Sequence, residues 1–288
     1  ILYLSPEVLL SYSIEKLIGS RDISTIIVDE AHIVTTWGQG FRPDYWYLGT
    51  YIEKLRRFRY KNGKLDLTSK KYNFPICTFT ATAVFGGKDD GVNEMAESLY
   101  LRDPIKFIGK VKRSDISFDI NVNTEELNAT ETIVRKTQDL KERIKTWQKN
   151  DEKSLIYFPY NTTAVQAYRM DEMFTGLFDE ENRGKIGIYT GQISKSIKKD
   201  SAIKYKSGEI KTMFATKAFG MGIDIKDIKH VYHYAEAGNL NDYVQEIGRA
   251  ARDENMLGIA HMDYYLKDRN YAKILFGMSA IRDFHVES

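Results

Sequence analysis

The stretch STIIVDEAHIVTTWGQGFRPDYW, residues 24 to 46, sets an apolar run before two carboxylates, followed by a segment rich in aromatic residues and glycine. The run, residues 23–28, has the continuous apolar character of a strand buried on both faces of a parallel sheet. Asp29 and Glu30 follow at its carboxyl end, where open α/β sheets bind their ligands. The stretch therefore predicts an α/β fold with an acidic ligand site at one edge of a sheet.

Further short apolar segments alternate with helical stretches along the chain. The candidate strands are residues 23–28, 74–80, 153–158, 185–190, 210–215 and 228–234. This alternation indicates parallel sheets flanked by helices, arranged as two α/β units. The polar stretch 119–130, rich in Asn and Thr, is predicted to link them. The expected units are residues 1–118 and residues 131–288, the second with a C-terminal helical extension.

A helix is predicted to begin at the end of this linker. Asn128 can cap its first turn, and Glu131 stands three residues on, as in a capping box. An apolar stripe at helical spacing follows, typical of a face packed on a core, and consists of Ile133, Leu140, Ile144 and Trp147.

Composition narrows the class of protein. The 42 Lys and Arg residues against 40 Asp and Glu leave a net charge of +2, so affinity for a polyanion must come from local clusters. Cys77 is the single cysteine, and no apolar stretch approaches the ~20 residues of a membrane helix. We expect a cytoplasmic protein, nucleoid-associated in a prokaryote, with no membrane partner. The chain begins at Ile1 inside an apolar segment, so we expect it to be a piece of a longer protein.

The acidic pair has the chemistry of a phosphate site. Asp29 can hold Mg²⁺ on the phosphates of a nucleotide, and Glu30 can orient an attacking water. In the distant segment 245–253, Arg249 and Arg252 lie three residues apart, a spacing that turns both guanidiniums to one side of a helix. Such a pair suits a clamp on a transferring phosphoryl group. Surface carboxylates and a solvated basic face are the alternative interpretations.

Several motifs resemble, in order, those of superfamily 2 helicases of the RecQ-like branch. They are YLSPEVL (3–9), DEAH (29–32), TTWGQGFRPDY (35–45), FTATA (79–83), SLIYFPYN (154–161), ATKAFGMGID (215–224) and QEIGRAARD (245–253). They resemble motif Ib, motif II, the aromatic-rich loop, and motifs III, IV, V and VI of that family. Motif II alone is weakly specific, whereas the loop followed by motifs V and VI is strongly so. The resemblance runs from about residue 3 to residue 265.

The resemblance implies two RecA-like lobes, with ATP and Mg²⁺ between them and single-stranded or forked DNA across their top. It implies that Asp29 holds the metal, that Glu30 activates water and that His32 links the nucleotide site to the DNA side. From the second lobe, the residues implied to reach the phosphates are Gln245, Arg249 and Arg252, the two arginines as finger candidates.

The remaining motifs imply further contacts. They imply that Thr80 and Thr82 couple the lobes and that Thr216 and Lys217 contact nucleic acid. The implied nucleotide-binding residues of motif V are Gly220, Gly222 and Asp224. Glycine lets a loop approach a phosphate closely, and a carboxylate can bond a ribose or an arginine. Other protein subunits are further candidate partners.

The aromatic loop explains the second half of the opening stretch. Trp37 and Phe41 can stack on unpaired bases, at ~1–3 kcal/mol per base, and Arg42 can neutralise a phosphate. The alternative is that both aromatic side chains fill a core. The neighbouring Gly38, Gln39, Gly40 and Pro43 favour a loop.

Some features have plainer interpretations. The basic segment 54–71 is either a DNA-contacting arm or a solvated excursion of the surface. His230 and His233 lie in a strand at a spacing that does not face both side chains together, so we expect structural histidines and no metal site. Ala251 and Glu254 stand where the family usually has glycine, a departure that removes no catalytic group.

No phosphate-binding loop of the pattern G-x-x-x-x-G-K-[ST] occurs in the sequence. In the family this loop precedes motif Ib, so we expect an incomplete first lobe, and we expect residues 1–288 alone to bind ATP poorly and to hydrolyse little. Three functions remain. They are an ATP-driven DNA helicase or translocase moving 3′ to 5′, an RNA-directed motor, and a nucleic-acid-binding module without catalysis.

Overall fold

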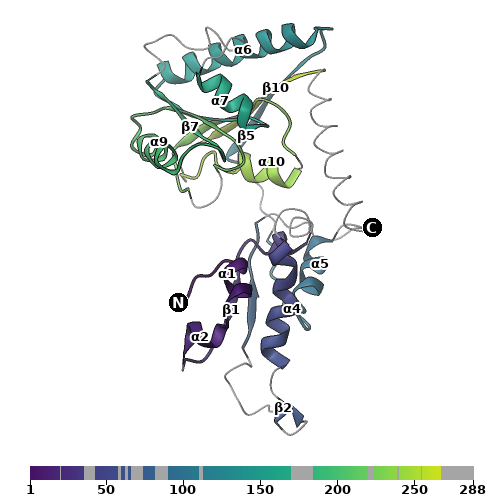
Figure 1. Cartoon of the computed structure of the whole chain (residues 1–288). Coiled ribbons are helices and arrows are strands. Elements are labelled where there is room, and N and C mark those ends of the chain that lie inside the picture. The colour runs from purple at the N-terminus through teal and green to yellow at the C-terminus, as the bar shows by residue number, and fades with distance from the viewer. Residues whose placement is uncertain are drawn as a thin grey trace. The chain divides into compact units, whose positions relative to one another are not determined.

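The computed structural model describes residues 1–19, 21–35, 43–57, 60–61, 64–65, 74–81, 90–109, 113–169, 184–219, 223–238, 240–253 and 255–266. The chain forms two compact units (Figure 1). The first unit ends at Gly109. None of the described helices combines the length and the apolar character needed to cross a lipid bilayer.

The first unit contains a two-stranded parallel sheet with helices around it. Its elements are α1 (Pro6–Ser11), α2 (Ile14–Ile18), β1 (Ile26–Val28), η1 (Ala31–Val34), α4 (Pro43–Arg57), β2 (Tyr60–Lys61), β3 (Lys64–Leu65), β4 (Ile76–Thr78) and α5 (Gly91–Ser98). β1 and β4 pair in parallel, with Ile26 opposite Ile76 and Val28 opposite Thr78. β2 and β3 form an antiparallel pair inside the basic segment 54–71.

The core of the first unit lies between its sheet and its helices. It is formed by Ile14, Val28, Ala31, Val34, Leu48, Ile52, Leu55, Phe74, Met95 and Leu99. Gly49 lets α4 approach the end of α5, since a Cβ there would lie 1.9 Å from the backbone oxygen of Ser98. The other face of the sheet is covered less, because Ile27 and Phe79 are 64% and 57% exposed.

The second unit is a six-stranded sheet in which every pairing is parallel. Its elements are β5 (Ile116–Asn123), α6 (Ala129–Lys149), β6 (Lys153–Tyr157), α7 (Asn161–Arg169), β7 (Ile186–Tyr189), α9 (Lys195–Ser207), β8 (Thr212–Ala215), β9 (Ile228–His233), α10 (Leu240–Ile247) and β10 (Gly258–Tyr265). The strand order is β5-β10-β9-β6-β8-β7. The chain crosses from one side of β6 to the other between β8 and β9, so the strand order reverses there.

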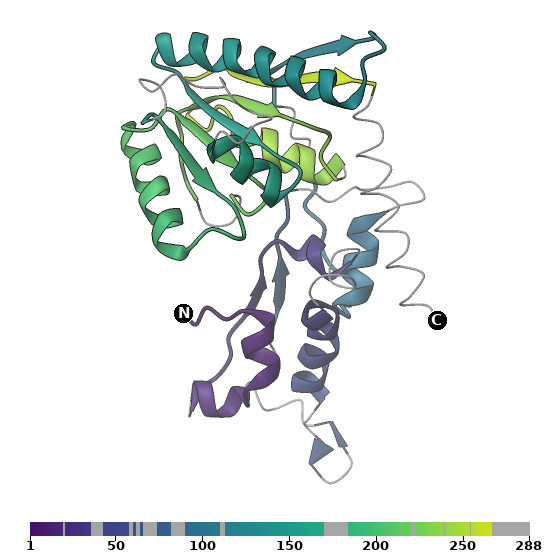
Figure 2. The ribbon, with the colours of Figure 1, turned by 45° about the horizontal axis from the view of Figure 1, so that its top comes forward.

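Helices cover both faces of this sheet (Figures 1 and 2). On one face, residues of α6 and α7 pack on Ile156, Phe214 and Tyr232. On the other face, residues of α9 and α10 pack on the alternate positions Leu155, Met213 and Val231. This burial on both sides explains why the central strands read as continuous apolar runs.

The predicted parallel α/β architecture is confirmed. Each of the six predicted strands is present, shortened by up to three residues at its start and up to two at its end. The capping box is present as well: Asn128 Oδ1 accepts from the Glu131 amide at 2.9 Å, and Glu131 Oε2 accepts from the Asn128 amide at 2.8 Å. Of the predicted stripe, Leu140, Ile144 and Trp147 are buried, whereas Ile133 is half-buried.

The predicted linker and the predicted end of the first unit at residue 118 differ from the structure. Residues 116–123 form β5, which pairs with β10 along its whole length. As an edge strand, β5 has polar residues toward α6, among them Asp119, and leaves Phe118 and Val122 about 60% exposed on its other face. Because polar and apolar residues alternate along β5, its sequence has a polar composition overall, and this explains why residues 119–123 were predicted to belong to a linker. The expected C-terminal helical extension lies outside the described residues.

Candidate nucleotide and nucleic-acid site

The acidic pair lies at the carboxyl end of β1, as predicted. Beyond the strands, the ends of β1 and β4 stay joined, because the Phe79 amide donates to Val28 O at 2.9 Å and the Ala31 amide donates to Phe79 O at 2.9 Å. The chain turns at Glu30, whose φ of 49° is left-handed, and the Glu30 amide donates to Asp29 Oδ1 at 2.9 Å. Both carboxylates are thereby held at the edge of the sheet, exposed to solvent.

A side-chain contact joins this edge to β4. Nδ1 of His32 lies 2.9 Å from Thr80 Oγ1 and 3.4 Å from Glu30 Oε2. The His32 side chain is 17% exposed and that of Glu30 is 55% exposed. The histidine therefore lies between a carboxylate at the end of one strand and a hydroxyl at the end of its neighbour. The structure thus brings together three of the predicted site residues.

Some predicted site residues lie outside the part of the chain that the structure describes. These are Trp37, Phe41, Arg42, Thr82, Gly220 and Gly222.

In the second unit, the two predicted finger arginines lie in a turn after α10. The helix ends at Ile247, so the expectation that Arg249 and Arg252 share a helix face is wrong. Ala251, between them, has a left-handed φ of 50°, and its amide donates to Ile228 O at 3.0 Å, which stops the helix against the sheet. We call residues 248–252 the two-arginine turn.

The two arginines have different surroundings. Arg249 Nε is buried, and no described residue accepts a hydrogen bond from it. Its guanidinium lies beside the Tyr157 hydroxyl, and burial raises the pKa of that hydroxyl above its usual value, although the nearby Arg249 lowers it. Arg252 is closer to solvent, and its Nη1 lies 3.4 Å from Asp224 Oδ1. Gln245 lies one turn earlier, on α10.

The turn after β8 carries Thr216 and Lys217. Thr216 is buried; its amide donates to Tyr189 O at 3.3 Å, and its carbonyl accepts from the Phe219 amide at 2.8 Å. Lys217 Nζ lies 2.6 Å and 2.7 Å from the two carboxylate oxygens of Asp242 on α10. The pKa of Lys217 is below its usual value, because burial lowers it by more than the neighbouring Asp242 carboxylate raises it. Sequence reasoning did not identify Asp242 as the partner of this lysine.

The histidines of β9 face different neighbours, as predicted. His233 Nε2 lies 2.7 Å from Glu246 Oε2, and its ring stacks on Tyr157 with centroids 5.4 Å apart. This contact fixes α10 over the ends of β6 and β9. Sequence reasoning also missed Glu246.

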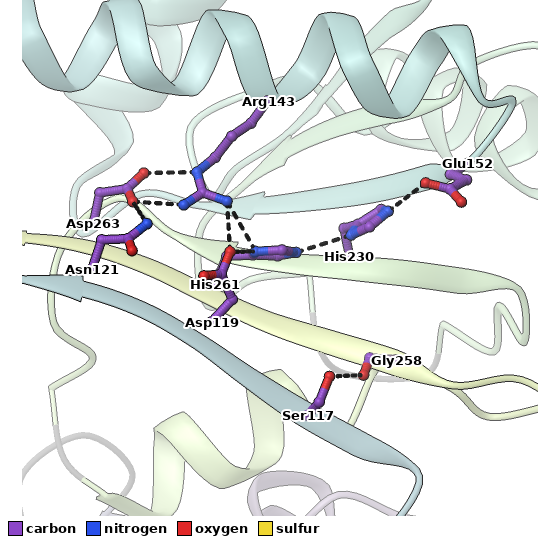
Figure 3. Close-up of polar contacts among 9 residues, drawn as sticks. All are labelled: Ser117, Asp119, Asn121, Arg143, Glu152, His230, Gly258, His261 and Asp263. Atoms are coloured by element: carbon purple, nitrogen blue, oxygen red, sulfur yellow. Dashed lines mark hydrogen bonds and ion pairs between the residues drawn. The ribbon is translucent and has the colours of Figure 1, made fainter.

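His230 belongs to a separate network under α6, drawn in Figure 3. Its Nε2 lies 2.8 Å from Glu152 Oε2, and its Nδ1 lies 2.9 Å from His261 Nε2. His261 Nδ1 lies 2.8 Å from Asp119 Oδ2 and 3.2 Å from Arg143 Nη1. We call these five residues the histidine network. Among the described residues, no group of three or more His, Cys, Asp or Glu side chains could hold a metal ion.

The model of the helicase conserved C-terminal domain matches residues 135–254. The chain is 33% identical over 256 residues to the ATP-dependent DNA helicase RecQ of Synechocystis sp., a match that covers 88% of this chain and 46% of that relative. The chain spans less than half the length of the curated relatives it matches, among them the helicase SGS1 of Saccharomyces cerevisiae, of which it covers 15%.

Solved structures show the same fold at low identity. A variant of Dbp5 from S. cerevisiae, bound to RNA and ADP BeF3, superposes with a TM-score of 0.64 at 16% identity, covering 95% of this chain and 62% of that chain. The helicase Lhr of Mycobacterium smegmatis, bound to single-stranded DNA and AMP-PNP, gives 0.58 at 19% identity, covering 90% and 31%. Together with the domain model and the RecQ relatives, the ordered motifs and the two parallel α/β units make this chain a member of the RecQ-like branch of superfamily 2 helicases.

Proposed function

We propose that this chain is part of the motor of an ATP-dependent DNA helicase or translocase that moves 3′ to 5′ on single-stranded DNA and unwinds forked duplex. The observation that carries the proposal is the contact between His32 and Thr80, because it links the acidic pair of motif II to motif III. The RecQ relatives, named as ATP-dependent DNA helicases, support the same activity. We further propose a cytoplasmic location, associated with the nucleoid in a prokaryote.

The acidic edge fits a bound Mg²⁺. Magnesium in nucleotide sites usually takes one or two carboxylates and completes its shell with phosphate oxygens and water. Asp29 Oδ1 accepts from the Glu30 amide, and no described residue donates to its other carboxylate oxygen. We infer that Asp29 would hold the ion, which when bound neutralises charge on the phosphates. Glu30, 55% exposed and beside His32, would accept the proton of the attacking water.

The two-arginine turn fits the phosphates of ATP. Arg249 keeps a buried Nε without an acceptor among the described residues, so an anion at this position would complete its hydrogen bonding. We infer that Arg249 and Arg252 would stabilise the charge that spreads over the transferring phosphoryl group. Gln245 would orient a phosphate oxygen, and Asp224 would bond either the ribose or Arg252.

Nucleic acid is proposed to bind along the aromatic loop and the turn after β8. We infer stacking on Trp37 and Phe41 and phosphate contacts from Arg42, Thr216 and Lys217. Lys217 is held by Asp242, so a strand phosphate would have to compete with that carboxylate. Thr80 and Thr82 would transmit strand binding to the acidic pair through His32.

The direct test is Glu30→Gln in the complete protein. We expect ATP hydrolysis stimulated by single-stranded DNA, and with it unwinding of a forked duplex, to fall by about 10²-fold or more, because removal of a general base typically costs 10²–10⁴-fold. The matched control is Glu97→Gln, an exposed carboxylate of α5, which should leave both rates unchanged. Hydrolysis and unwinding that survive in the Glu30→Gln variant would refute the motor and favour a module that binds nucleic acid without catalysis.

An RNA-directed motor is the second candidate, because the Dbp5 structure of the same fold was bound to RNA. Stimulation of hydrolysis by single-stranded DNA and by single-stranded RNA of equal length separates the two. The DNA proposal expects the stronger stimulation from DNA. Residues 1–288 in isolation are proposed to hydrolyse little ATP, and robust Mg²⁺-dependent turnover by them would contradict this.

A further inference from the structure

Arg113 is the first described residue of the second unit, and its side chain hydrogen-bonds to the two-arginine turn. Its Nη2 donates to Ala250 O at 2.9 Å and to Ala251 O at 3.3 Å, and its Nη1 donates to Gly248 O at 3.4 Å. One side chain therefore serves three carbonyls of the turn. No motif points to Arg113, and it lies 135 residues before Gly248 in the sequence.

The Asp115 carboxylate orients this guanidinium. Its two oxygens accept from Arg113 Nε at 2.9 Å and 3.1 Å, and Oδ2 also accepts from Nη2 at 2.7 Å. The Arg113 guanidinium lowers the pKa of Asp115, chiefly through these hydrogen bonds. Asp115 is itself tied to the sheet, since its carbonyl accepts from the Gly258 amide at 2.8 Å. The fork-to-fork geometry leaves the far side of the arginine free to face the turn.

The sheet supports the same turn from the other side. The Ala251 amide donates to Ile228 O, and Gly258 lies so close that a Cβ there would be 2.7 Å from the Cβ of Ala250. Figure 3 shows Gly258 at the start of β10, beside Ser117 of β5. The turn is therefore held between Gly258 and the guanidinium of Arg113. The left-handed φ of Ala251 costs energy for a residue other than glycine, so the turn needs such support.

We propose that Arg113 is a positioning residue: by bonding the carbonyls of Gly248, Ala250 and Ala251, it sets the directions in which Arg249 and Arg252 present their guanidiniums. The proposal rests on the proposed hydrolysis of ATP by this site. It also links the turn to the chain segment that leads in from the first unit, since Arg113 follows the boundary at Gly109 by four residues. Bonding three carbonyls takes the planar fork of donors that a guanidinium presents. The compact ammonium group of lysine does not have this geometry.

The test compares Arg113→Ala and Arg113→Lys in the complete protein, with Arg135→Ala as control. Arg135 is an exposed arginine of α6 whose Nε lies 3.8 Å from Asp139, and its loss should leave the rates unchanged. For Arg113→Ala we expect kcat of ATP hydrolysis to fall about 10- to 100-fold, because small misplacements of catalytic groups cost up to about 10²-fold. KM for ATP should change less than about threefold, since the finger arginines act mainly in the transition state. Arg113→Lys should fall between the parent and the alanine variant.

A second measurement does not depend on catalysis. The amides of Arg249, Ala250 and Ala251 are hydrogen-bonded in the parent, so their hydrogen exchange reports the order of the turn. In both Arg113 variants we expect these amides to exchange at least about tenfold faster while the central strands stay protected. Unchanged exchange, or an unchanged kcat in a folded variant, overturns the proposal. A parent without ATPase activity would refute the proposed function, while the exchange result would still decide whether Arg113 positions the turn.

Discussion

Acidification should destabilise the second unit through the histidine network. His230 has 4% of its side chain exposed, and burial lowers its pKa from 6.5 to about 4, with the neighbouring His261 adding to the effect and Glu152 opposing it. Burial also lowers the pKa of His261. Both rings are packed against Trp147, with centroids 4.5 Å and 4.9 Å from it. The groups that face the two histidines are Glu152, Lys229, Asp119, Arg143 and Asp263.

With one proton on each ring, the two histidines can donate two hydrogen bonds, one fewer than their three contacts with Glu152, with each other and with Asp119. If His230 Nε2 donates to Glu152, its Nδ1 can accept from His261 Nε2, and His261 Nδ1 can then accept from Arg143 Nη1. Arg143 Nη1 then donates to both His261 Nδ1 and Asp119 Oδ2, and the 2.8 Å contact between these two atoms is not a hydrogen bond, because neither atom carries a proton. Each ring carries one proton in this arrangement. An additional proton would place a positive charge on a buried ring, and burial disfavours that charge.

The lowered pKa of His230 determines how the free energy of unfolding changes with pH. Between pH 6.5 and 4 the unfolded chain binds a proton at residue 230 and the folded chain does not, so the free energy of unfolding decreases as the pH falls. The loss is about 1.4 kcal/mol per pH unit, hence about 3 kcal/mol for His230 across the window. It is absent above pH 6.5 and complete below pH 4, and His261 adds a loss of the same sign.

Urea unfolding at pH 7.5, 6.5, 5.5 and 5.0 can measure this. Trp147 is the one tryptophan of residues 110–280, so its emission in a Trp37→Phe, Trp46→Phe background reports the second unit alone. His230→Gln should reduce the pH slope by about 1.4 kcal/mol per unit, whereas the control His32→Gln, in the first unit, should leave it unchanged. A free energy of unfolding that stays constant from pH 6.5 to 5.0, or an equal slope in His230→Gln, would refute this reasoning.

Three further substitutions test packing and coupling. Asn128→Ala removes both bonds of the capping box and should lower the stability of the second unit by about 1 kcal/mol, measured by urea unfolding. Gly49→Ala places a Cβ 1.9 Å from Ser98 O and should destabilise the first unit by about 1–3 kcal/mol in a thermal melt, whereas Gly109→Ala, with no heavy atom within 4 Å, should not. Thr80→Val removes the hydroxyl bonded to His32, worth about 1 kcal/mol, so unwinding per ATP hydrolysed should fall about fivefold in a helicase assay; an unchanged ratio would argue against coupling through this contact.

Local patterns predicted the framework and the acidic half of the site. Central strands are apolar on both faces, so their sequence reports their burial directly, and the chemistry of Asp29 and Glu30 follows from their place after such a strand. The capping box of α6 is likewise contained within four residues. Edge strand β5 was missed because its polar side is satisfied by distant partners, which a linear reading cannot see.

The contacts that complete the site come from far along the chain. Asp242 reaches Lys217 across 25 residues, and Arg113 reaches Ala250 across 137. Their side chains give no local signal, because any exposed helix or loop carries similar charges. Only the parallel packing of β5 beside β10, which brings Arg113 and Asp115 to the start of β10, places them at the two-arginine turn.

The pairing of β5 with β10 also has a consequence for synthesis. Ile116 opposite Gly258 joins positions 142 residues apart, and β5 is the first strand of its unit to leave the ribosome. At typical elongation rates of 5–20 residues per second, β5 would wait roughly 7 to 28 s for its partner. During that time the backbone edge of β5 that pairs with β10 stays open, and so does the side chain of Ile116, which is 6% exposed in the finished fold. We therefore expect nascent chains stalled before residue 258 to be bound by chaperones, and those released after residue 265 to escape them.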